Sequence, residues 1–245
     1  MRRTVMTMAI AMAAVALVAL PPAGAATPRL PDLGMASLAD FRIETPPGQR
    51  LLRFTALVVN VGAGPFDLKG VRKNTTVTEM RVKQRLFNDD GTKSTLATSA
   101  TMFYAGDGHD HWHVRDLQRY TIHSIGTDTE LSAGAKTGFC FFDGVAYRLS
   151  LPRAPQRPRY SSCGASASTT VSMGLSVGWG DVYPWNLAFQ WIDISALPAG
   201  DYIVRAKADP KGLFTEASKG NNATWTKIRI GATNQVTVLE QGPAA

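Results

Sequence analysis

Three of the four histidines in this chain fall close together, at His109, His111 and His113. Alternate residues of a β-strand project from one face, so a strand here would present the three imidazoles together. Imidazole nitrogen is a common ligand for zinc, copper, iron and nickel. The spacing therefore predicts a metal site on a strand, in preference to a solvated strand with three exposed imidazoles.

The identity of the metal stays open on these residues. A blue-copper centre needs a cysteine thiolate beside the histidines, and non-haem iron oxygenases favour two histidines and a carboxylate. Three histidines with an open coordination position suit type-2 copper or zinc equally well.

The elements around this segment read as short strands separated by turns. Strands are expected at 51–59, 80–87, 147–151, 189–194, 202–208, 224–230 and 235–239, and the histidine strand is expected to continue to Ile122. Beyond the first 25 residues no stretch has a convincing helical period. The pattern predicts an all-β fold: a β-sandwich-like single domain with long loops, or a related open barrel. It would span 26–240 and leave a loose tail at 241–245.

The first 25 residues have the pattern of a signal peptide. Arg2 and Arg3 precede an apolar run at 5–20, and 23–25 offer an Ala-Gly-Ala cleavage site. The protein is therefore expected to be secreted, with no membrane partner after cleavage. In an oxidising compartment, the isolated pair Cys140 and Cys163 favours one disulfide over buried free thiols or soft copper ligands.

Charge excludes one class of partner. The formal net charge is +7, but the Lys and Arg residues are scattered along the chain. A nucleic-acid partner usually requires a basic stripe with interleaved aromatic residues, so none is expected.

Several segments resemble the lysyl oxidase family. His109 to His113, followed by Asp116, resembles that family's copper-binding segment. Residues 136–140 (Lys-Thr-Gly-Phe-Cys) are similar to the segment with its cofactor lysine. Residues 178–183, leading into 190–194, resemble the segment with its cofactor tyrosine. With 197–202 and 216–230, the likeness covers about 51–230.

The resemblance implies a self-derived cofactor and a copper(II) ion held by His109, His111 and His113. Lys136 and Tyr183 would cross-link into lysine tyrosylquinone, and Asp181 is a candidate general base, with a turn-capping role as its alternative. The implied activity is that of a secreted amine oxidase. A primary amine or a protein lysine would react with O2 to give an aldehyde, hydrogen peroxide and ammonia.

Two other functions remain open beside this one. The chain could be a non-catalytic extracellular copper-binding module, or a zinc hydrolase that uses the same three histidines.

A second resemblance concerns calcium. Asp32, Leu33, Glu216, Asn221 and Asn222 resemble the structural calcium ligands of some family members. Ser218 stands where a carboxylate is expected, which removes one hard oxygen charge. The alternative is an asparagine turn between strands.

The positive charge conflicts with polycationic substrates, which the chain would repel. A local acidic patch formed by Asp107, Asp110, Asp116 and Asp181 is expected to offset this repulsion near the site.

Overall fold

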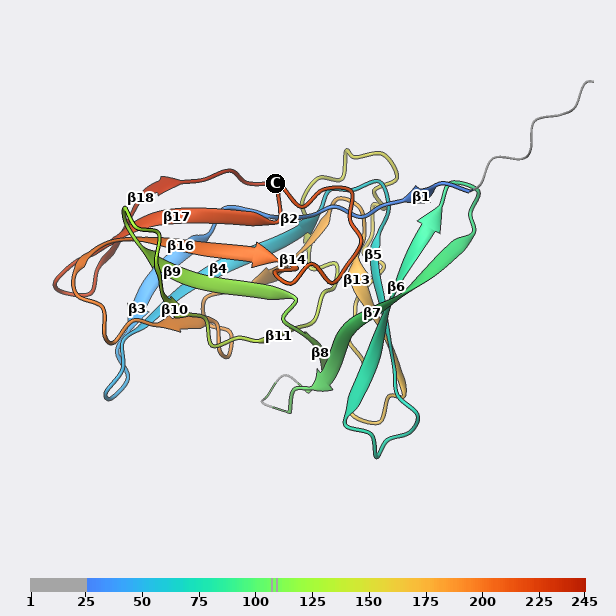
Figure 1. Ribbon diagram of the computed structural model, residues 1–245, viewed down its shortest axis with the longest axis horizontal. Helices are drawn as coiled ribbons and strands as arrows, with labels where there is room; N and C mark the ends of the chain where they lie inside the picture. Colours follow the sequence, from blue (N-terminus) through green and yellow to red (C-terminus); the bar gives the residue numbers. More distant parts are fainter. Residues whose placement is uncertain (1–25, 107, 109) are drawn as a thin grey trace, which may run out of the picture.

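The computed structural model describes residues 26–106, 108 and 110–245. Within these residues the chain forms strands β1 to β18 and no helix, which confirms the predicted all-β fold (Figure 1). The expected signal peptide lies outside the described residues. The described part of the chain contains no helix that could serve as a membrane span.

One sheet is organised around a single long strand. Strand β4 (Leu51–Asn60) pairs with four antiparallel neighbours along its length. The other strands of this sheet are β2 (Leu33–Met35), β3 (Ala39–Glu44), β12 (Val145–Ala146), β14 (Trp179–Tyr183) and β15 (Trp191–Asp193). The β-branched and apolar residues of β4 suit a strand that is buried through most of its length.

A five-stranded antiparallel sheet covers this first sheet. Its order is β10 (Glu130–Ala133), β9 (Gln118–Ser124), β16 (Gly200–Ala208), β17 (Ala223–Ile230) and β18 (Val236–Gln241). Alternate residues of β9 and β16, such as Tyr120, Ile122 and Val204, point inward and join Phe54 and Val58 of β4 in one core. The two sheets therefore form the sandwich that the sequence predicted.

A third sheet extends to one side of this sandwich (Figure 1). Its order is β11 (Gly138–Phe139), β8 (Trp112–Arg115), β7 (Lys93–Tyr104), β6 (Glu79–Asn88), β5 (Phe66–Val71) and β13 (Thr170–Leu175), with β1 (Pro28–Arg29) on β6. The sequence analysis did not predict β5, β7 or β13.

Two predicted strands differ from the structure. The expected continuous histidine strand is divided into β8 and β9, because Asp116 takes a left-handed backbone conformation, φ 54°, between them. This conformation is tolerated by Asp and ends a ladder, so the two halves enter different sheets. Residues 147–151, which were expected to form a strand, do not form one. The strand nearest to them, β12, ends at Ala146.

Both cysteines behave as predicted. Cys140 and Cys163 form a disulfide, with their Cα atoms 6.1 Å apart. The terminal residues expected to be loose make backbone contacts: the amide of Ala245 donates to Met35 O, and the amide of Gly242 donates to Trp225 O.

Replacing both cysteines by alanine should destabilise the fold. On the chain-entropy model, closure of a loop of about 24 residues contributes about 3.5 kcal/mol. The double variant Cys140→Ala/Cys163→Ala should therefore have a lower midpoint in urea at an unchanged m-value. The reduced wild type provides the matched control, and an unchanged midpoint in both would contradict the structural role of the bridge.

Candidate functional site

Strand β14 brings Asp181 and Tyr183 to one buried face. They are alternate residues, so Val182 between them points outward and is 37% exposed, whereas Asp181 and Tyr183 are 1% and 4% exposed. The Tyr183 hydroxyl donates a hydrogen bond to the carbonyl oxygen of Cys140, at 2.6 Å. The position of the phenol ring is therefore fixed from two different elements.

Lys136 lies in the link between β10 and β11, which is held by backbone hydrogen bonds on both sides. The amide of Ala135 donates to Trp191 O, and the amide of Asp116 donates to Thr137 O. The Lys136 side chain is buried, and its Nζ lies 5.7 Å from the centroid of the Tyr183 ring. The two residues predicted to form the cofactor are thus brought together across a long sequence separation.

Asp181 is an acidic group in a poorly solvated place. Burial raises the pKa of Asp181 to about 8, although Tyr183 and Lys136 oppose the shift. Neither carboxylate oxygen has a hydrogen-bond partner of good geometry among the described residues, because the Tyr183 hydroxyl donates to Cys140 instead. Asp181 lies inside β14 and not in a turn, which is the setting that the turn-capping alternative requires.

Two aromatic residues that the sequence analysis did not select complete this site. Phe139 packs edge-on against Tyr183, with ring centroids 5.2 Å apart, and Tyr120 packs against Phe139 at 5.9 Å. Burial, together with the charge of Asp181, raises the pKa of the Tyr183 hydroxyl well above its usual value. Tyr120 resembles an ordinary core residue in the sequence, and only its spatial position identifies it.

The histidines are placed differently from the prediction. Strand β8 begins at Trp112, so His113 lies in the strand and His111 precedes it. The two rings nevertheless meet, with centroids 4.7 Å apart. The third predicted ligand, His109, lies outside the described residues, and no group of three or more metal-binding side chains is found within those that are described.

The two described histidines lie close enough together to share one metal ion. Their Nε2 atoms lie 2.9 Å apart. Two nitrogens bound about 2.0 Å from one ion lie about 2.8 Å apart at a right angle and about 3.3 Å apart at the tetrahedral angle. The observed 2.9 Å lies between these two values and is also the length of a hydrogen bond between the two rings, so the pair could share one ion, and the distance does not identify the metal.

A glycine allows the histidine segment and the lysine segment to approach each other. Gly138 of β11 lies beside β8, and a Cβ there would come within 2.4 Å of the Phe103 ring and 3.0 Å of His113 Cβ. The motif around Lys136 therefore requires a residue without a side chain at this position.

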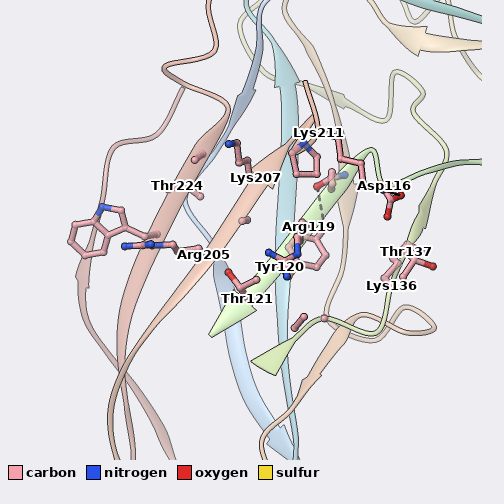
Figure 2. Close-up of a pocket in the computed structure, with 17 residues that line it drawn as sticks. Asp116, Arg119, Tyr120, Thr121, Lys136, Thr137, Arg205, Lys207, Lys211 and Thr224 are labelled. Atoms are coloured by element: carbon pink, nitrogen blue, oxygen red, sulfur yellow. Dashed lines mark hydrogen bonds and ion pairs between the residues drawn. The ribbon is translucent and has the colours of Figure 1, made fainter. Parts of the chain in front are cut away.

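Two cavities meet at Lys136. The smaller one has a volume of about 220 Å³ and is lined by Phe103, Phe189 and residues 135–138. The larger one, of about 790 Å³, includes Lys136, Thr137 and Tyr120 in its lining (Figure 2). Open space therefore lies on both sides of this lysine.

The residues predicted to bind calcium converge on Glu216. One of its carboxylate oxygens accepts the amide of Leu33 at 2.9 Å, and the other accepts Nδ2 of Asn222 at 3.1 Å. The Oδ1 atoms of Asp32, Asn221 and Asn222 are buried and have no hydrogen-bond partner among the described residues. Oxygen donors suited to a hard cation are thus present.

A lysine that the sequence analysis missed occupies this cluster. The ammonium of Lys219 lies 2.5 Å from Glu216 Oε1 and 2.6 Å from Asp209 Oδ2. Burial disfavours the charge of this ammonium, but its hydrogen bonds to Asp209 and Glu216 outweigh that effect and raise the pKa of Lys219. The cluster as it stands therefore already contains a cation, and it does not fit calcium without displacing that cation.

Comparisons with known proteins agree with the geometry. The sequence model of the lysyl oxidase family, described as "Lysyl oxidase", matches residues 69–240. Lysyl oxidase homolog 1 of Homo sapiens is 29% identical over 132 residues, which cover 51% of this chain and 21% of that protein. Protein-lysine 6-oxidase of Sus scrofa is 29% identical over 122 residues, which cover 49% of this chain and 44% of that protein.

The matched part thus spans less than half the length of each of these relatives. The family model, however, matches well over half of the chain, and its range includes the histidine, lysine and tyrosine segments. The chain belongs to the lysyl oxidase family.

Proposed function

We propose that this protein is a secreted, copper-dependent amine oxidase. With water and O2 it converts primary amines, including the lysine side chains of proteins, to aldehydes; water supplies the aldehyde oxygen, ammonia is released, and O2 is reduced to hydrogen peroxide. The observation that carries this proposal is the position of the Lys136 amine, 5.7 Å from the centre of a buried tyrosine ring in a lysyl oxidase fold.

The chain contains candidate residues for the metal ion and the cofactor that this function requires. His109, His111 and His113 would hold copper(II), and Lys136 and Tyr183 would form lysine tyrosylquinone. Together these groups supply the electrophilic carbonyl and the electron sink that oxidation of an amine requires.

Other side chains of the protein position the Tyr183 ring and hold or accept a proton beside it. Phe139 packs against the Tyr183 ring and keeps bulk water away from it. Tyr183 and Asp181 share the same face of β14, so the carboxylate lies beside the ring on which the amine would react. Since its pKa is about 8, Asp181 holds a proton at neutral pH and accepts one from substrate more readily as the pH rises through 8.

The two alternative functions lack comparable support. The match to the lysyl oxidase family argues against a zinc hydrolase that uses the same three histidines. A copper-binding module without catalysis leaves the burial of Asp181 and Lys136 beside Tyr183 without a role.

The cross-link can be tested by peptide mapping. Trypsin should fail to cleave after Lys136, and the peptide 120–148 should travel with the peptide 160–205 that contains Tyr183. The Cys140–Cys163 disulfide joins the same two peptides, so the protein must be reduced and alkylated first. The link should appear only after aerobic addition of copper.

The controls for this experiment are matched in size. Lys136→Arg keeps the charge and restores cleavage at 136, and Tyr183→Phe removes the phenol oxygen at nearly constant volume. Both should retain the fold and lose amine oxidation. Separate peptides from copper-loaded wild type, or wild-type peroxide production by Tyr183→Phe, would refute the assignment.

The raised pKa of Asp181 predicts a dependence of stability on pH. In the unfolded chain this carboxyl loses its proton near pH 4, but in the folded protein it keeps the proton to about pH 8. The folded state therefore binds the additional proton between these values, and its stability falls as the pH rises, by at most about 1.4 kcal/mol per pH unit.

Asp181→Asn keeps the shape of the side chain and removes this titration. The difference in unfolding free energy between the variant and the wild type should grow from pH 4 to pH 8 and then level off. Urea unfolding at several pH values measures it, with the copper-free protein used throughout. Parallel curves for the two proteins would show that the carboxyl is ionised in the fold.

For the calcium cluster we infer that the ammonium of Lys219 takes the place of the ion. Lys219→Met should leave Glu216 and Asp209 as unpaired buried carboxylates and lower stability by about 2 kcal/mol, less than for a fully buried pair because the lysine is 44% exposed. Calcium at about 5 mM should then raise the Tm of the variant but not of the wild type.

Lys73→Met, at an exposed turn position, is the control for loss of a positive charge. A wild type that chelators destabilise as strongly as the Lys219 substitution would contradict the inference.

A further inference from the structure

The larger cavity beside Lys136 has a cationic wall. Four basic side chains from β9, β16 and the turn after β16 line it, and Asp116 is the single acidic residue in its described lining. The four are Arg119, Arg205, Lys207 and Lys211. In Figure 2 they lie around the same cavity as Lys136 and Thr137, which come from the link before β11.

Three of these cations have a carboxylate partner, and one does not. The pairs are Arg119 with Glu130 at 2.6 Å, Arg205 with Asp128 at 2.8 Å, and Lys211 with Asp116 at 2.7 Å. Lys207 is exposed and has no ion pair with any residue that the structure describes. The excess positive charge of the wall is therefore centred on Lys207.

The sheet register places two of the cations directly opposite each other. Lys207 of β16 is the cross-strand partner of Arg119 of β9. Glu130 compensates the charge of Arg119 but not that of Lys207, so part of the like-charge repulsion remains, and folding alone does not favour it. An anion bound between the two side chains would relieve the repulsion, which makes the pair a suitable site for a carboxylate.

Two of the four residues expected to form an acidic patch, Asp116 and Asp181, offer no exposed and unpaired carboxylate, and a third, Asp107, lies outside the described residues. Asp116 is bound to Lys211, and Asp181 is buried in β14. The approach to Lys136 is consequently positive, which disfavours a lysine flanked by other basic residues.

We propose that this cavity selects amine substrates that carry carboxylates next to the reacting amine, and specifically lysine residues in acidic peptide segments. The proposal rests on the proposed amine oxidase function and adds the substrate class to it. The reacting lysine enters beside Lys136, while a flanking Asp or Glu binds between Lys207 and Arg119.

The effect should be moderate and sensitive to salt. Exposed ion pairs contribute little individually, so two such contacts give about a tenfold preference in affinity. Screening at about 0.5 M salt should remove most of this preference, whereas contacts made by the apolar stem of the lysine should persist.

Binding and turnover should be measured separately. Short fluorescent peptides with one lysine, flanked by Glu, by Gln or by Arg, are titrated into the Tyr183→Phe protein and followed by anisotropy. The Glu-flanked peptide should bind about tenfold more tightly than the Arg-flanked one. In the copper-loaded wild type, kcat/KM for peroxide release should follow the same order.

Lys207→Glu is the decisive variant. It replaces a repulsive pair with Arg119 by an attractive one, so its Tm should be no lower than that of the wild type, and its peptide preference should vanish or reverse. Lys73→Glu makes the same change of net charge at a turn outside the cavity and should keep the preference.

The outcomes separate the two proposals. Equal binding of the three peptides, or an acidic preference that survives Lys207→Glu, overturns the cavity assignment even if neutral amines are oxidised. An acidic preference that depends on Lys207, in a protein that forms no cross-link and no peroxide, retains the cavity assignment and overturns the oxidase function.

Discussion

The hydrogen bond from the Tyr183 hydroxyl to the Cys140 carbonyl connects the segments that contain the candidate site residues. A buried phenol without an acceptor would be destabilising, so the bond constrains both partners. Cys140 directly follows β11, and β11 pairs with β8, the strand that contains His113. The other end of the bond is β14, in a different sheet. One polar contact thus relates the tyrosine ring to the histidine segment.

Strand β4 provides the rigid support for this contact. It pairs with β14 through Val58 and its neighbours, and the close approach of the two strands depends on Gly180, where a Cβ would lie 2.7 Å from Val58 O. Register on a buried strand is fixed by which residues face the core, and a slip of one residue would exchange Val182 with Asp181 and Tyr183. The orientation of Asp181 and Tyr183, the two candidate site residues, is therefore determined by packing and not by the side chains themselves.

The sequence predicted those features that depend on local pattern. Strands such as β4 and β17 were identified from apolar or alternating residues, and the disulfide from the number of cysteines. The break at Asp116 escaped prediction because its left-handed conformation is one of several that an aspartate tolerates. The pairing of Lys136 with Tyr183 followed only from a family resemblance, since no local rule relates them. The role of Lys219 in the Glu216 cluster was not predicted, because only the folded structure brings its partner Asp209 next to it.

The chain uses its lysines in three physically different environments, and this explains why net charge alone is a poor guide to its partners. Lys136 is held among aromatic rings, where water is scarce. Lys219 is bound by two buried carboxylates, so its charge is cancelled where it stands. Lys207 faces solvent opposite another cation. Of the three, only the charge of Lys207 acts at a distance on an approaching molecule. The charge of Lys219 is cancelled by its carboxylate partners, and Lys136 is enclosed by the fold. The field that an approaching molecule meets near Lys136 is therefore set by cations such as Lys207, which has no carboxylate partner among the described residues.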